Sequence, residues 1–130
     1  MASSETKTAE INPAIAHWNG PLGLPEFAAI ADHDFDAAFA AALPAHLAEI
    51  EAIAQNSEAP TFENTIVALE CAGELLDRAA SIFWNLSGAN TNDTIQALER
   101  KLAPEMSRHS SAISMNSALF DRIDTLYQNR

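Results

Sequence analysis

The chain has 130 residues, a formal net charge of −11 and 48% hydrophobic residues. This length and hydrophobic content allow one domain with a packed core. The excess of acidic groups disfavours binding to nucleic acids or to anionic membrane surfaces, because phosphates repel it. A single cysteine, Cys71, excludes an intrachain disulfide and is typical of a reducing compartment.

The first 33 residues show no helix-length apolar pattern. Residues 1–10 are rich in Ser, Thr, Ala and Glu, and we expect a disordered tail there. Repeated Pro and Gly between residues 12 and 25 predict a loop, which Trp18 would anchor to the body as an extended arm. The start lacks the features of a signal peptide, and no stretch approaches the roughly 20 apolar residues of a membrane span. A cytoplasmic location is therefore expected.

Residues 34–130 predict about four helices and no strand, because apolar residues recur at spacings of three and four. The first helix should run from Asp34 to Gln55, capped by Asp32 or Asp34. Pro44 lies within it and predicts a kink or short break near residues 40–43. The apolar stripe of this helix consists of Phe35, Ala38, Phe39, Ala42, Leu43, Leu47, Ile50 and Ile53.

The second helix should begin after Thr61 as N-cap and continue without a break to Ser87. Its apolar residues follow a heptad pattern, which is typical of a helix packed lengthwise on a neighbour. This seam consists of Phe62, Ile66, Leu69, Gly73, Leu76, Ala80 and Phe83. Gly73 within the seam predicts the close approach of another helix.

The third helix should begin at Thr91, Asn92 or Asp93, with a kink at Pro104. Its stripe consists of Ile95, Leu98, Leu102, Met106, His109 and Ile113. The fourth helix should follow Asn116 as N-cap. Its apolar face consists of Leu119, Phe120, Ile123, Leu126 and Tyr127. The predicted fold class is therefore all-α, with about four helices in an antiparallel bundle-like arrangement.

No catalytic or metal-binding pattern stands out. The four histidines are His17, His33, His46 and His109, and no two of them share a helical turn. A zinc peptidase typically has two His at i and i+4 on one helix, with a Glu between them. We expect His33 to satisfy backbone groups at a helix start, His109 to be partly buried in the core, and the others to be exposed or near a helix cap. We predict no catalytic, cofactor-binding or metal-ligating residue in this chain.

Several short strings nevertheless occur in a characteristic order. They are residues 24–27, 30–33, 37–39, 49–56, 60–66, 68–70, 73–78, 91–93 and 119–123. Together they resemble the amino-terminal region of the thimet-oligopeptidase family of zinc metallopeptidases. The Gly-Glu-Leu-Leu string at residues 73–76 and the Thr-Asn-Asp string at 91–93 are most similar to bacterial peptidyl-dipeptidases.

The resemblance implies a longer, helical, two-lobed parent protein that removes dipeptides from the carboxyl end of oligopeptides. The family holds its zinc with a His-Glu-x-x-His helix and a further Glu, none of which has a match here. Residues 11–130 would then form an amino-terminal helical domain, with the remainder of the polypeptide as partner. The alternative is a stand-alone helical interaction or scaffold module. In both cases apolar helix faces would be exposed, and we expect self-association.

Overall fold

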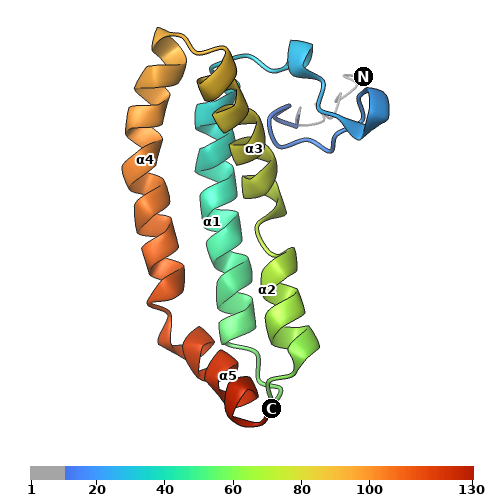
Figure 1. Cartoon of the computed structure of the whole chain (residues 1–130), viewed down its shortest axis with the longest axis vertical. Helices are drawn as coiled ribbons and strands as arrows, with labels where there is room; N and C mark the ends of the chain where they lie inside the picture. Colours follow the sequence, from blue (N-terminus) through green and yellow to red (C-terminus); the bar gives the residue numbers. More distant parts are fainter. Residues whose placement is uncertain (1–10) are drawn as a thin grey trace, which may run out of the picture.

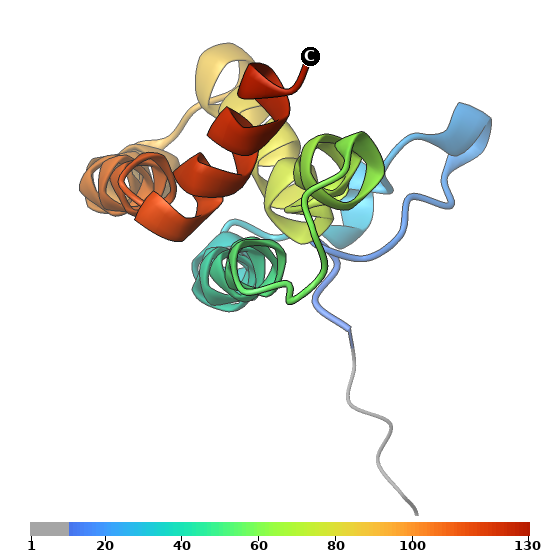
Figure 2. The same ribbon diagram turned by 90° about the horizontal axis from the view of Figure 1, so that it is seen from below.

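The computed structural model describes residues 11–130, and within that range it is helical and contains no strand (Figure 1). Its main elements are α1 (Asp34–Ala54), the π-helical segment η3 (Phe62–Val67), α2 (Ala68–Cys71), α3 (Glu74–Ala89), α4 (Asp93–Ser114) and α5 (Ser117–Gln128). Helix α1 runs down the molecule, η3, α2 and α3 return as one antiparallel column, and α4 runs down again. Helix α5 crosses the lower end (Figures 1 and 2). The prediction of an all-α, bundle-like fold is confirmed.

The arm before α1 contains two 3₁₀ turns, η1 (Pro21–Gly23) and η2 (Phe27–Ala29), and lies beside α3 (Figure 1). Ala14 is fully buried, and Trp18 packs against the main core, which confirms the predicted anchor. Arg78 of α3 donates a hydrogen bond of 3.0 Å to the carbonyl of Ile15. The disordered tail predicted for residues 1–10 lies outside the described residues.

Two apolar clusters form the core, and α1 contributes to both. In the upper cluster the ring of Phe83 on α3 lies edge-on to Phe35 and Phe39 of α1, with centroids 5.3 and 5.6 Å apart. The lower cluster joins the end of α1 to α5, and its buried members are Ile50, Ile53, Ala54 and Leu119. Burial of each large apolar side chain contributes roughly 1.5–3 kcal/mol, so α1 is the element on which the other helices pack.

The short break considered at Pro44 did not occur, and Pro104 does not interrupt its helix either. Helix α1 is continuous through Pro44, and α4 is continuous through Pro104 (Figure 1). A proline leaves the carbonyl four residues earlier without its helical donor. Residues Ala40 and Arg100, which carry those carbonyls, are exposed, as are both prolines. The free carbonyls therefore lie on the solvent side of each helix, while core packing on the opposite side keeps the helix together.

The prediction that no stretch approaches a membrane span was wrong for α1. By length and composition alone, residues 34–54 are long and apolar enough to cross a bilayer. In this fold the same helix packs against α3, α4 and α5. The predicted stripe was correct except at Leu47, which is 36% exposed.

The N-terminal caps were predicted with mixed success. Thr61, Asn92 and Asn116 each accept a hydrogen bond from the backbone three residues on, as expected. At the start of α1, neither aspartate caps. The N-cap residue is His33, whose side chain makes no capping bond, and Asp34 instead accepts from the amide of Ala31 at 2.7 Å. The predicted role of His33 in satisfying backbone groups was therefore wrong.

The continuous second helix was the main error. Ala72 adopts an extended conformation and Gly73 has φ +83°, so the column ends α2 at Cys71 and restarts α3 at Glu74. Only glycine enters this left-handed region without strain. The close approach expected at Gly73 does exist, because a Cβ there would come within 3.0 Å of the ring of His46 on α1.

Gly73→Ala should lower the free energy of unfolding by about 1–3 kcal/mol, since it adds left-handed strain and a clash with His46. Gly88→Ala provides the matched control. Gly88 lies in α3 with open space around it, so alanine there should raise stability by up to about 1 kcal/mol. Urea unfolding of both variants measures the difference, and equal effects would contradict the assigned role of Gly73.

Candidate functional site

The most unusual polar cluster lies where α1, the α2–α3 break and α4 meet. Nδ1 of His46 and Nε2 of His109 are 2.9 Å apart and share a hydrogen bond, with ring centroids separated by 4.9 Å. On the same face of α1, Glu49 accepts a 2.7 Å hydrogen bond from the backbone amide of Gly73. Helix α1 is thus hydrogen-bonded to the α2–α3 break through Glu49 and to α4 through His46.

Burial changes the chemistry of this histidine pair. His109 is only 8% exposed, and its Nδ1 atom has no partner among the described residues. Burial, and secondly the nearby charge of His46, lowers the pKa of His109 below its usual value of 6.5. A neutral His109 is thus favoured near neutral pH.

Only half of this arrangement could be predicted from the sequence. His109 was expected to be partly buried in the core, which is confirmed, but His46 was expected to be exposed or near a helix cap and is instead half-buried within α1. The two histidines lie 63 residues apart, so no spacing rule could pair them. The sequence signal was the spacing of His46, which lies three residues after Leu43 and four before Ile50 and so falls on the apolar stripe.

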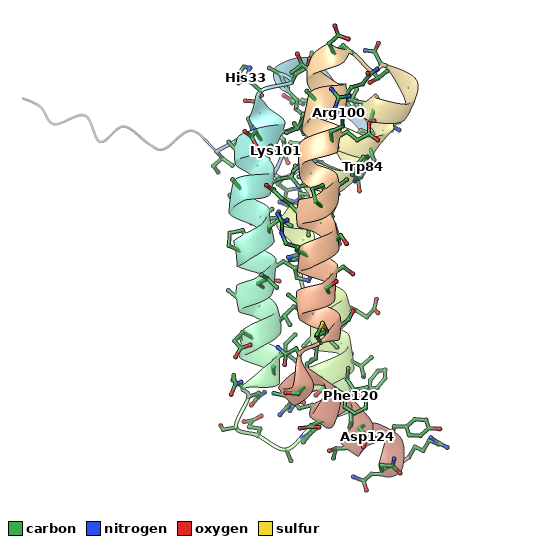
Figure 3. The ribbon with its side chains drawn as sticks, turned by 90° about the vertical axis from the view of Figure 1, so that its left-hand side faces the viewer. His33, Trp84, Arg100, Lys101, Phe120 and Asp124 are labelled. Atoms are coloured by element: carbon green, nitrogen blue, oxygen red, sulfur yellow. The ribbon has the colours of Figure 1, made fainter. Side chains whose placement is uncertain are left out.

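The other residues considered for chemistry lie apart from this pair. His17 and His33 are exposed, and His33 lies 3.5 Å from Asp34 at the top of the bundle (Figure 3). Cys71 is also exposed and unpaired. Within residues 11–130 there is no group of three or more His, Cys, Asp or Glu side chains that could hold a metal ion. The described residues therefore offer no ligand set for a hydrolytic zinc.

A buried arginine joins α5 to the loop before η3. Nη1 of Arg122 donates to the carbonyls of Asn56 and Glu58, and Nη2 donates to Oδ1 of Asn64, each at 2.9 Å. Arg122 is 7% exposed. Asn64 also completes the cap of η3 by accepting from the amide of Thr61, so one arginine supports the start of the whole α2–α3 column.

The helix face predicted for α5 was therefore partly wrong. Leu119 is buried, but Phe120 is 62% exposed and Tyr127 is 58% exposed, while Arg122 takes an inward position. Figure 3 shows Phe120 projecting from α5 at the lower end of the molecule. Other exposed apolar residues of this end are Phe62, Val67 and Met115. We call the five exposed ones the lower apolar residues: Phe62, Val67, Met115, Phe120 and Tyr127. Exposed apolar groups in such number are typical of a surface that another element covers.

The upper half carries a different kind of surface. Nζ of Lys101 on α4 donates to Oδ1 of Asp36 on α1 at 2.6 Å, and this hydrogen bond raises the pKa of Lys101 (Figure 3). Between the arm and α3 is an open hollow of about 370 Å³, where Arg78 pairs with Glu74. The guanidinium of Arg78 is thus already occupied by that carboxylate and by the arm carbonyl.

Comparison with known proteins identified two curated relatives, although no protein-family model matches the chain. It is 39% identical over 120 residues to dipeptidyl carboxypeptidase from Escherichia coli K12, which is 92% of this chain and 18% of that protein. It is also 39% identical over 119 residues to dipeptidyl carboxypeptidase from Salmonella typhimurium LT2, with the same coverage. The chain thus spans about a fifth of the length of these relatives, and the resemblance to bacterial peptidyl-dipeptidases is confirmed.

Arg122→Met should lower the free energy of unfolding by about 2–4 kcal/mol, because two carbonyls and the Asn64 side chain lose their buried charged donor. Arg100→Met is the control. Arg100 is exposed on α4 (Figure 3), so its replacement should change stability by no more than about 0.5 kcal/mol. Chemical denaturation gives both values; an Arg122 variant as stable as the control would contradict the assigned role.

Proposed function

We propose that this chain is a helical segment of a zinc-dependent peptidyl-dipeptidase that removes dipeptides from the carboxyl end of oligopeptides. The supporting observation is identity of 39% across 92% of the chain, combined with coverage of only 18% of each relative. Most of such a protein would then lie in polypeptide other than these 130 residues. The chain would supply part of a helical lobe beside the peptide channel, and the parent enzyme would work in the cytoplasm.

The catalytic zinc is proposed to belong to the remainder of that polypeptide. The family resemblance implies a His-Glu-x-x-His helix as the zinc site, and this string does not occur in the 130 residues. There the metal would polarise the scissile carbonyl and activate water. The role of this chain is then mechanical, because its packed core would give a fixed wall against which the catalytic part is placed.

The lower apolar residues are the proposed contact with that remainder. Phe62 and Phe120, each more than 60% exposed, come from η3 and α5, which pack on one another. Removing apolar surface from water contributes roughly 25 cal/mol per Å². The two segments are also held together by Arg122, so the surface they carry would be in place before a partner binds.

A stand-alone interaction module is the competing function, since the same exposed residues could bind another protein. The reading frame beyond Arg130 distinguishes the two. Several hundred further codons that include a His-Glu-x-x-His helix would support the peptidase segment, and an immediate stop codon would support the module.

The isolated chain should show no zinc-dependent cleavage of a blocked oligopeptide above a metal-free control. Liquid chromatography with mass detection would measure dipeptide release. The full-length protein encoded by the same reading frame, assayed in parallel, should release dipeptides from the carboxyl end and lose this activity with a zinc chelator. Turnover by the 130-residue chain alone would refute the assignment of the catalytic centre to other polypeptide.

The isolated chain should also self-associate through its lower apolar residues, since the rest of the polypeptide, which is proposed to cover them, is missing. Phe120→Ser combined with Tyr127→Ser should shift the population toward monomer, as measured by light scattering over a concentration series. Thr125→Ser is the matched control, because Thr125 is exposed on the same helix and should leave association unchanged. If the unsubstituted 130-residue chain stays monomeric at high concentration, this prediction is wrong.

A further inference from the structure

We propose that His46 and His109 form a proton-sensitive latch between α1 and α4. The latch is closed while the pair holds no more than one extra proton, and it opens when both rings are cationic. It rests on the 2.9 Å hydrogen bond between the two rings and on the burial of His109. This inference is independent of the proposed function, because it concerns how the bundle itself responds to pH.

The bond sets a limit on the number of protons. Of the two nitrogens that face each other, one must carry hydrogen and the other must offer a lone pair. With one extra proton in the pair, the doubly protonated ring can still donate to the lone pair of the other ring, so the bond is kept. A second proton gives both facing nitrogens a hydrogen, so the bond is lost and two positive charges are left in contact.

His109 cannot accept that second proton in place. Its Nδ1 atom is buried and has no partner among the described residues. In the doubly protonated pair both nitrogens of His109 carry hydrogen, and neither the buried Nδ1–H nor the Nε2–H that faces His46 has an acceptor, which is costly. The ring must therefore move toward water to be charged, and this movement separates α4 from α1.

Carboxylates on α1 and α3 are occupied by other groups. Glu49 on α1 accepts from the amide of Gly73, which the His46 ring also contacts. Glu74, at the start of α3, pairs with Arg78. Neither acts on the pKa of His109, which responds to burial and to His46. The negative charges of these two carboxylates therefore do not offset the cost of charging His109.

The charged groups of α4 and α5 do not raise the pKa of His109 either. Glu105 lies one turn before His109 on α4 and acts electrostatically on Lys101. Arg108, the neighbour of His109 in sequence, is exposed and is itself cationic. On α5, Arg122 is bound to loop carbonyls and is also positive. The surroundings therefore oppose the doubly protonated state.

Opening would affect the lower half of the bundle more than the upper half. The upper cluster is held by three phenylalanine rings in edge-to-face contact, and Lys101 ties α4 to Asp36 there. Below the histidine pair, the link of α4 to the core depends on the smaller cluster that includes Leu119. Release of the latch would free the end of α4 together with α5, which carries Phe120 and Tyr127.

The first test measures stability as a function of pH. Because folding lowers the pKa of His109 below 6.5, the stabilisation is complete above pH 6.5 and is lost as pH falls below it. One extra proton bound by the unfolded chain changes the unfolding equilibrium constant by up to about tenfold per pH unit. Between pH 7 and 5 the unaltered chain should therefore unfold about tenfold more readily, beyond the change in a latch-free variant.

The latch-free variant is His46→Asn with His109→Gln, whose amide groups can keep a neutral hydrogen bond in the same place. The control is His17→Gln with His33→Gln, which removes two exposed histidines and should retain the full pH response of the unaltered chain. Equal pH dependence in the latch-free variant and the unaltered chain would overturn the proposal.

A second measurement decides the matter even if the latch-free variant does not fold. Nuclear magnetic resonance of the ring Cε1–H groups in the unaltered chain, from pH 8 to 5, should show His109 titrating below the exposed histidines. The amide signals of lower α1 and α4 should shift along with it. If His109 titrates with the exposed histidines, and the helix amides do not respond, the latch does not exist.

Discussion

The contact of the His46 ring with Gly73 is the constraint on which the arrangement of helices depends. The ring takes the space that a side chain at residue 73 would need, and the left-handed backbone there turns the column between α2 and α3. Glu49 holds the same amide from one turn further along α1. With the break fixed, α3 lies against the upper part of α1, while η3 reaches the lower end beside α5.

The sequence predicted the helices well because burial of apolar side chains is periodic and local. The stripe of α1, the cap residues Thr61, Asn92 and Asn116, and the all-α class all follow from spacing and side-chain chemistry. The same rule failed at Gly73. A heptad pattern runs through that residue, but periodicity carries no information about φ, and the glycine was interpreted only as a small residue on a seam.

The residues at the candidate site could not be predicted, because each acts on a partner far away in the chain. His46 meets His109 across 63 residues, and Arg122 reaches Asn64 across 58. In each case the polar side chain faces inward, while a neighbouring residue that the helical pattern placed in the core is exposed: Leu47 beside His46, and Phe120 near Arg122. A buried polar group is tolerated only with a hydrogen-bonding partner, and a partner of this kind becomes visible only when the fold is known.

These polar contacts also explain how a segment of a larger protein could keep its shape while one face stays uncovered. Apolar contacts alone are non-directional and tolerate sliding of one helix along another. Hydrogen bonds with fixed partners at both ends of α1 do not, so Arg122 keeps α5 against the loop before η3 whether or not Phe120 has a covering surface. The fold is thereby separated from the surface proposed to bind the rest of the enzyme. Opening of the proposed histidine latch would move α5 together with the surface that it carries, and the residues that form that surface would stay the same.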